Sequence, residues 1–381
     1  MIYLDNAATT AIDPRVLEAI MPYLTDSFGN PSSSYSAGRT SRLAIETARK
    51  TVAQLLGVKP STIFFTSGGT ESNNTAIAAA IRDIGCTCII TSPIEHHAVL
   101  HTAEYYSHQY NVPLHLVSLN ADGTIDYDDL ESKIAGLTEQ GHKCLVSLMH
   151  ANNEIGSLLD MNRVGRWCRQ HNACFHSDCV QTIGHYPLNL LESGVHLVSG
   201  AGHKFHGPKG AGLLYVSSDI QIRPLIYGGG QERNLRAGTE NVYGIVGFAR
   251  ALEIAMQSFQ TDSEYIGGLK AYMQRKLVQN IPGISFNGPE DSLYTVLSVC
   301  FPKTEESDSL LLSLDMAGIC VSGGSACSSG GNGSHVISAI RKAGECNTVR
   351  FSFCKNNTKE ELDQVVDLVK SILVPQPEPA I

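Results

Sequence analysis

Short apolar runs alternate with longer amphipathic stretches over the first two-thirds of this 381-residue chain. Each run is short, as in a buried strand, and the stretches between the runs carry apolar residues at helical spacing. Such an alternation predicts a mostly parallel sheet that helices cover on both faces. Two helices precede it, one over residues 14–28 and a long one that ends at Gly57. The predicted strands are residues 63–65, 88–90, 145–148, 173–175 and 197–198.

The pattern changes after Asn241. Strand-like and helix-like segments then follow one another without regular alternation, which predicts a second, smaller α+β domain. We therefore expect an α/β protein with a large domain over residues 14–250 and a small domain that combines residues 1–13 with 251–381. The elements expected after Asn241 are a long helical region over about residues 242–280, helices over residues 307–317, 335–343 and from Thr358, and strands over residues 296–301, 319–321 and 349–353.

Lys204 lies in the stretch VHLVSGAGHKFHGPKGAG, residues 195–212, where an apolar run gives way to Gly, His and Lys. Ligands of open α/β sheets bind outside the carboxyl ends of the strands, and each apolar run of this chain ends in polar residues. A lysine desolvated at such a place holds a free amine that can form a Schiff base, and pyridoxal phosphate is the commonest carbonyl cofactor held in this way. The alternative interpretation is that Lys204 is an ordinary loop lysine with no role in cofactor binding.

Other strand ends offer groups that suit the same cofactor. Gly69 and Thr70 lie at a strand-to-helix junction, where backbone N–H groups and a hydroxyl can bind phosphate. His96 can stack on a flat ring and move protons. Asp178 can pair with a protonated ring nitrogen, and Gln181 can reach the ring hydroxyl. Each of these residues also fits an ordinary helix cap or turn. Neither a Walker loop nor a G-x-G-x-x-G motif occurs, which argues against a nucleotide, and the spacing argues against a metal site.

Cys327 lies in SGGSACSSGGNG, residues 322–333, whereas most of the other cysteines lie in apolar runs. A thiol on a segment of small residues can visit a site and leave it again, and an incidental exposed cysteine is the alternative. The chain has eleven cysteines and no C-x-x-C pair. This pattern predicts reduced thiols rather than a disulfide framework or a zinc site.

Charge and hydropathy limit the partners of the chain. The net charge of −9 argues against a nucleic acid or an anionic membrane as the main partner. No apolar run approaches the roughly 18 residues of a membrane-spanning helix, and the first residues lack a basic region followed by an apolar one. We therefore expect a cytoplasmic protein with no membrane or direct nucleic-acid partner.

A series of motifs extends over nearly the whole chain. The motifs are YLDNAATT (3–10), FGNPSS (28–33), TSGGTESNN (66–74), EHHAVL (95–100), MHANNEIG (149–156), HSDCVQTIG (176–184), GHKFHGPKG (202–210), GGGQERNLRAGTEN (228–241), SGGSACSS (322–329) and VRFSF (349–353). In their order and spacing they resemble the cysteine desulfurases of the class-V aminotransferase group, the NifS/IscS-like enzymes. The joint match is far more specific than any one motif.

The resemblance implies an aminotransferase-like fold, pyridoxal 5'-phosphate as the cofactor, and a homodimer. Lys204 matches the Schiff-base lysine, Cys327 the catalytic cysteine, and Arg350 the clamp on the substrate carboxylate. The remaining matches are His96 for ring stacking and proton transfer, Asp178 for the ring nitrogen, Gln181 and Asn153 for the ring hydroxyl and the substrate, Gly69, Thr70 and His203 for the phosphate, and Thr239 for a phosphate contact from the neighbouring subunit.

The implied reaction converts L-cysteine to L-alanine and leaves the sulfur as a persulfide on Cys327. An acceptor protein then takes it, either an iron–sulfur scaffold or a tRNA-thiolation enzyme. The alternatives are a selenocysteine lyase or another class-V aminotransferase, neither of which depends on Cys327, and a non-catalytic relic of the fold. The chain departs from the family at Ala201, where a phosphate-binding serine is usual, at Ala11, where proline is usual, and in its shorter tail.

Overall fold

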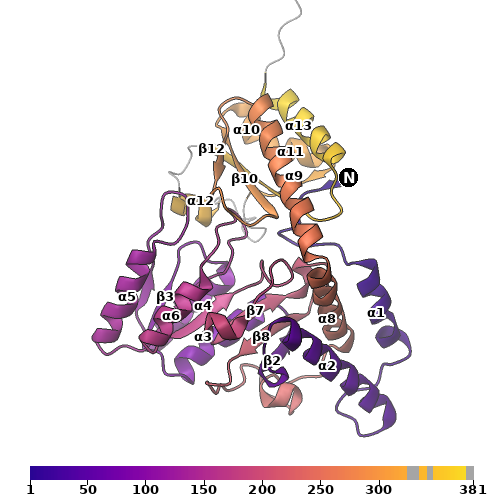
Figure 1. The fold of residues 1–381 in the computed structure, drawn as a ribbon, viewed down its shortest axis with the longest axis vertical. Helices are drawn as coiled ribbons and strands as arrows, with labels where there is room; N and C mark the ends of the chain where they lie inside the picture. Colours follow the sequence, from indigo (N-terminus) through magenta and orange to yellow (C-terminus); the bar gives the residue numbers. More distant parts are fainter. Residues whose placement is uncertain (324–333, 341–345, 375–381) are drawn as a thin grey trace, which may run out of the picture.

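A seven-stranded sheet forms the centre of the larger part of the molecule (Figure 1). The computed structural model describes residues 1–323, 334–340 and 346–374. Strand β8 runs antiparallel to both of its neighbours, and the remaining pairs are parallel, so the predicted mostly parallel sheet is confirmed. In spatial order the strands are β2 (Ile63–Thr66), β8 (Gly212–Val216), β7 (Leu197–Ala201), β6 (Cys174–Asp178), β5 (Cys144–Ser147), β3 (Cys88–Thr91) and β4 (Leu114–Leu116).

Both faces of this sheet are buried, as parallel sheets require. Successive side chains point to opposite faces, so Ile89 packs in one core and Ile90 in the other. Full burial of each such side chain contributes roughly 1.5–3 kcal/mol, which makes the two cores the main source of stability. One face is covered by α3 (Gly69–Arg82) and α4 (His97–Tyr110), and the other by α1 (Pro14–Thr25), α2 (Ser36–Leu55), α5 (Tyr127–Glu139), α6 (Met161–Gln170) and α8 (Val242–Gln257). We call this assembly the seven-stranded region.

A smaller antiparallel sheet lies above it in Figure 1 and has its own core. Its strands are β9 (Ser285–Asn287), β10 (Val296–Pro302) and β12 (Cys346–Ser352). Helices α9 (Phe259–Asn280), α11 (Leu310–Met316) and α13 (Lys359–Leu373) pack against them, and α10 (Glu305–Asp308) precedes α11. We call this assembly the three-stranded region.

The N-terminus belongs to this second core. Strand β1 (Ile2–Tyr3) pairs in parallel with β11 (Ile319–Cys320), and Leu4 is fully buried among the apolar side chains of the three-stranded region. The division into residues 14–250 and residues 1–13 with 251–381 stays a prediction. Within the described residues, no helix is long and apolar enough to cross a membrane.

The long helical region predicted over residues 242–280 is present and consists of two helices. Helices α8 and α9 meet at Ser258, whose hydroxyl donates to the Ile254 carbonyl (3.1 Å) and to Asp262 Oδ2 (2.6 Å). A serine that bonds back to the preceding turn bends a helix. The break lets α8 pack in the seven-stranded region while α9 packs in the three-stranded region.

The expectation of reduced cysteines fails at one pair. Cys300 on β10 and Cys346 on β12 form a disulfide between neighbouring antiparallel strands. Spacing in the sequence could not indicate this, because the strand pairing brings the two residues together across 46 positions. The other eight described cysteines are free and all but Cys320 are buried, as the apolar runs around most of them predict. Cys327 lies outside the described residues.

Candidate active site

A cavity of about 240 Å³ opens at the carboxyl ends of the parallel strands. This is the edge at which ligands bind in open α/β sheets. It lies between the seven-stranded region and Arg350, which comes from β12. Most of the residues singled out in the sequence line it: Gly69, Thr70, His96, Asn153, Asp178, Gln181, His203, Lys204 and Arg350.

Lys204 stands where the chain leaves β7. The strand ends at Ala201, and one turn of 3₁₀ helix, Gly202–Lys204, turns the lysine toward the cavity. Its Nζ donates to the carbonyl oxygens of Ala7 (2.6 Å) and Ala8 (2.8 Å). The N-terminal segment therefore holds the amine at the cavity wall, next to the place where a carbonyl group would meet it.

Asp178 ends β6 and is held on both oxygens. The backbone N–H of Val180 donates to Oδ1 (2.9 Å), and the side-chain amide of Asn73 donates to Oδ2 (2.6 Å). Both side chains are almost fully buried. Two donors fix the carboxylate in one orientation, with the charge facing the cavity. The sequence reasoning assigned no role to Asn73, although it lies one helical turn after Gly69 and thus on the same side of α3.

The N-terminus of α3 faces the cavity through Gly69 and Thr70. No side chain among the described residues caps this helix, so its first N–H groups can bind an anion, and the helix dipole adds positive potential there. A side chain does not fit at position 69, because a Cβ there would lie 2.6 Å from Cγ2 of Val180. Ala201 lines the same part of the cavity and offers no hydroxyl.

Two histidines border the cavity in their neutral form. The Nδ1 atom of His96 caps α4 by accepting from the Ala98 N–H (3.1 Å), which places the ring proton on Nε2. Burial lowers the pKa of His96, although the nearby Asp178 opposes this. Burial, with the charges of two lysines, lowers the pKa of His203 to about 4. Both rings are therefore uncharged at neutral pH, and His96 presents a flat aromatic surface.

Arg350 is buried, and two groups far away in the sequence hold it. Its Nη2 donates to Asp5 Oδ1 (2.6 Å), and its Nη1 donates to the Asn153 carbonyl (3.0 Å). Its Nε is buried and has no partner among the described residues. The ion pair offsets the cost of a buried guanidinium, and the unpartnered Nε suits an anionic ligand. No local sequence pattern singles out Asp5 as a partner of Arg350.

Among the predicted site residues that the structure describes, Thr239 does not line this cavity. Thr239 lies at a separate cavity beside Phe65 and Arg236. This position neither supports nor excludes the expectation that it acts in the site of a neighbouring subunit. Cys327 lies outside the described residues, so the structure does not test its role.

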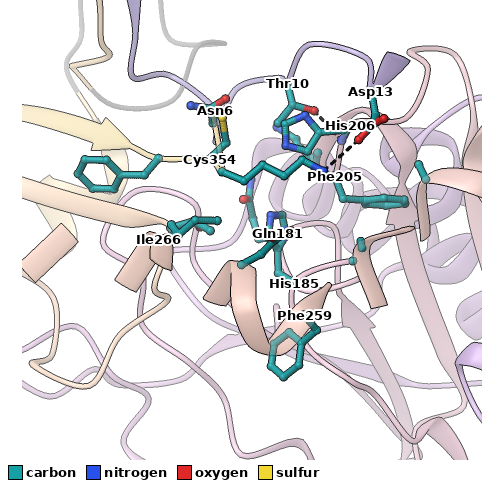
Figure 2. A pocket seen from close by; sticks show the side chains of 18 of the residues that line it. Asn6, Thr10, Asp13, Gln181, His185, Phe205, His206, Phe259, Ile266 and Cys354 are labelled. Carbon is teal, nitrogen blue, oxygen red and sulfur yellow. Dashed lines mark hydrogen bonds and ion pairs between the residues drawn. The ribbon is translucent and has the colours of Figure 1, made fainter. Parts of the chain in front are cut away.

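Lys204 also lines a second, smaller cavity, which Figure 2 shows. Gln181 and His185 contribute from the seven-stranded region, and Ile266 and Cys354 from the C-terminal part. Burial lowers the pKa of His185 to about 4. The volume of about 40 Å³ holds roughly three water molecules, so the larger cavity is the one that can take a cofactor.

Comparison with known proteins agrees with this arrangement. Residues 2–365 match the aminotransferase class-V family. The chain belongs to this family. Among its class-V relatives, the cysteine desulfurase IscS of Dictyoglomus turgidum is 42% identical over 379 residues, which cover 98% of this chain and 94% of that protein.

Solved structures give the same picture of this class-V chain. A NifS-like protein superposes with a TM-score of 0.87 at 38% identity, covering 98% of this chain and 99% of that one. A structure described as SspA in complex with cysteine superposes with a TM-score of 0.79 at 31% identity, covering 94% of this chain and 100% of that one. The expected aminotransferase-like fold is therefore confirmed.

Proposed function

We propose that this chain is a pyridoxal-phosphate-dependent cysteine desulfurase, which converts L-cysteine to L-alanine and keeps the sulfur as a persulfide on Cys327. The observation that carries the proposal is the convergence of Lys204, Asp178 and the N-terminus of α3 on one cavity. It occurs in a chain that is 42% identical to a cysteine desulfurase along nearly its whole length.

The residues around the cavity fit the proposed cofactor. The uncapped N-terminus of α3 at Gly69 and Thr70, with neutral His203 nearby, suits the phosphate. Asp178, fixed by two donors, suits the ring nitrogen, and the flat ring of His96 suits the face of the pyridine. Gln181 is assigned to the ring hydroxyl. When bound, the cofactor supplies an electron sink for the charge that forms on the substrate.

Each protein group then has one task. Arg350 holds the substrate carboxylate with its free N–H groups, and Asn153 lies beside it. Lys204 Nζ removes the α-proton of the substrate, and neutral His96 or Lys204 returns protons to the product. The Cys327 thiolate attacks the substrate sulfur, so an S–S bond forms as the Cβ–S bond breaks. The electron pair of the broken bond stays on the three-carbon fragment, which becomes alanine after protonation.

We further propose a cytoplasmic homodimer in which Thr239 reaches the phosphate of the partner subunit's site. Closed two-fold pairing would complete both sites equally. The acceptor of the sulfur is then a protein, either an iron–sulfur scaffold or a tRNA-thiolation enzyme. We propose no metal, membrane or direct nucleic-acid partner, in line with the acidic net charge.

The test is the product balance of the cofactor-loaded full chain with L-cysteine. We expect one alanine for each sulfur released in the presence of a reducing thiol, and a persulfide on Cys327 in its absence. A selenocysteine lyase would instead act on L-selenocysteine without needing Cys327. An aminotransferase would form a keto acid, and either result would contradict the proposal.

A further inference from the structure

Helix α12 (His335–Ile340) docks on the edge of the seven-stranded region, although its neighbours in sequence belong to the three-stranded region (Figure 1). Val336 is almost fully buried in a small apolar cluster with Ile94 and Ile155, which follow β3 and β5. The helix thus rests on the strand ends that form the active-site edge. The partly buried members of the cluster are Leu119, Ile337 and Ile340.

Polar contacts fix the start of this helix. Ser334 Oγ donates to Glu154 Oε2 (2.5 Å) and accepts from the Ile337 N–H (3.1 Å), so it both caps α12 and ties it to the large sheet. His335 Nε2 donates to the Glu95 carbonyl (2.9 Å). Glu154 is almost fully buried, and its Oε1 has no hydrogen-bond partner among the described residues. The Ser334 hydroxyl is therefore the main compensation for burying this carboxyl group.

Glu154 is presented by a rigid loop. The side chain of Asn152, itself fully buried, accepts from the N–H groups of Glu154 (2.8 Å) and Ile155 (3.0 Å) and donates to the Ile94 carbonyl (2.8 Å). The residue between them, Asn153, lines the active-site cavity and holds Arg350 through its carbonyl. One short loop thus binds both Arg350 and Ser334.

Ser334 comes seven residues after Cys327 in the sequence. On the other side of Cys327, Ser322 exchanges backbone hydrogen bonds with Arg350 (3.2 and 2.7 Å). Both flanks of the segment that carries the cysteine are therefore tied to the loop or the strand at the cavity edge. Among the described contacts, the one that Ser334 makes with Glu154 is thus the nearest attachment to Cys327 on its C-terminal side.

We propose that Glu154 is a positioning residue for sulfur transfer, which acts by binding Ser334 and so fixing the C-terminal flank of the Cys327 segment at the cavity edge. This inference rests on the proposed function of Cys327. When Ser334 loses its fixed position, the thiol seven residues before it is held less closely at the cavity, which lowers its effective concentration there. We therefore expect persulfide formation to slow about three- to tenfold when the contact is lost.

The experiment compares Ser334→Ala, Glu154→Ala and the double variant in the cofactor-loaded full chain. The first readout is hydrogen–deuterium exchange of the amides of residues 335–340, which needs no activity. The second is the single-turnover rate of persulfide formation on Cys327 with L-cysteine. Both single variants should raise exchange about tenfold, as expected for a lost buried hydrogen bond, and slow persulfide formation. The double variant should be no worse than either single one, because both remove the same contact.

Matched controls separate positioning from general damage. Ser218→Ala removes an exposed hydroxyl from the turn after β8, and Glu131→Ala removes an exposed carboxylate from α5. Neither should change either rate, and Glu154→Gln, which keeps an acceptor, should stay within about threefold of wild type in both readouts. The cofactor absorbance and its change on addition of L-cysteine should be unaltered in all variants.

Unchanged exchange and persulfide formation in both single variants, or strictly additive losses in the double one, would overturn the inference. A wild-type rate of alanine formation in Cys327→Ser would instead overturn the proposed function. The exchange measurement would still report on the Ser334 contact in that case, so the two failures can be told apart.

Discussion

The two regions of the molecule supply their functional groups in different ways. In the seven-stranded region, Asp178 and Lys204 follow directly from strands β6 and β7, and backbone geometry places them. The three-stranded region supplies Arg350, whose guanidinium donates hydrogen bonds to Asp5 and Asn153 from elsewhere in the chain. The groups proposed to face the cofactor are thus placed by the sheet itself, whereas Arg350, proposed to bind the substrate, depends on contacts between segments far apart in sequence.

The largest expected effect on activity comes from replacing a residue at the end of a strand of the large sheet. Lys204→Ala should remove the cofactor's lysine linkage and slow alanine formation at least about a thousandfold, because the same amine serves as anchor and as α-proton base. Visible absorbance of the reconstituted protein and steady-state alanine formation check both effects. Alanine formation at a rate near that of wild type would refute the assignment of this lysine.

Breaking a contact between distant segments should weaken the binding of the substrate rather than that of the cofactor. Asp5→Asn leaves the buried Arg350 without its charged partner, which should raise the KM for L-cysteine about tenfold with the cofactor still bound. It should also lower the free energy of unfolding by about 1–3 kcal/mol. The exposed Asp26→Asn is the control. An unchanged KM would mean that the ion pair does not orient Arg350.

Low pH should destabilise the seven-stranded region more than the three-stranded region. Thirteen of the fourteen histidines lie between His96 and His206, within the seven-stranded region. Burial lowers the pKa of His150 to about 4 and that of His176 to about 3, from 6.5 in the unfolded chain. Below pH 6.5 the unfolded state therefore binds more protons, and the free energy of unfolding falls as the pH drops toward 4.

Urea denaturation between pH 7 and pH 4, followed by hydrogen exchange, measures this difference. We expect a loss of a few kcal/mol, since one pKa unit corresponds to about 1.4 kcal/mol, with exchange rising first in strands β5 to β7. Glu95 titrates in the opposite sense, because burial raises its pKa to about 8 and favours its protonated form. Between about pH 4.5, the pKa of a free Glu, and pH 8 the folded state binds more protons at Glu95, so its contribution is lost as the pH rises through that range. Glu95 thus opposes the histidines in the measured range, and Glu95→Gln should make the fall in the free energy of unfolding toward pH 4 steeper. Earlier exchange in the three-stranded region at low pH would contradict the account.

The smallest expected effect concerns the close contact between Gly69, at the start of α3, and Val180. Gly69→Ala would bring a Cβ against Val180, so the cofactor affinity should fall about tenfold as the helix start shifts. Gly136→Ala on α5 meets no atom within 4 Å and should stabilise the protein by about 0.5–1 kcal/mol. Cofactor titration and thermal unfolding of both variants measure the contrast. Equal cofactor affinity in both would show that Gly69 is not needed for a close fit.

Periodicity and strand ends predict much of the fold and of this site. The strands near residues 88–90, 145–148 and 173–175 are present, and their polar ends converge because parallel strands end at one edge. Strand β8 was not predicted, since its apolar run follows the glycine-rich loop without a helix between. The Asp5–Arg350 pair, the Asn73 contact and the Cys300–Cys346 disulfide could not be predicted either, because each joins residues brought together only by the tertiary fold.

The central claim is that sulfur passes from cysteine to Cys327, and one variant tests it most directly. Cys327→Ser should bind the cofactor and L-cysteine normally, because Lys204, Asp178 and Thr70 are unchanged. It should form neither persulfide nor alanine, because a serine hydroxyl is neither ionised at neutral pH nor nucleophilic toward sulfur. The measurement is alanine release together with mapping of the protein-bound persulfide in wild type and variant. Alanine release by the variant at the wild-type rate, or a persulfide on Cys179 or Cys354 instead, would contradict the account.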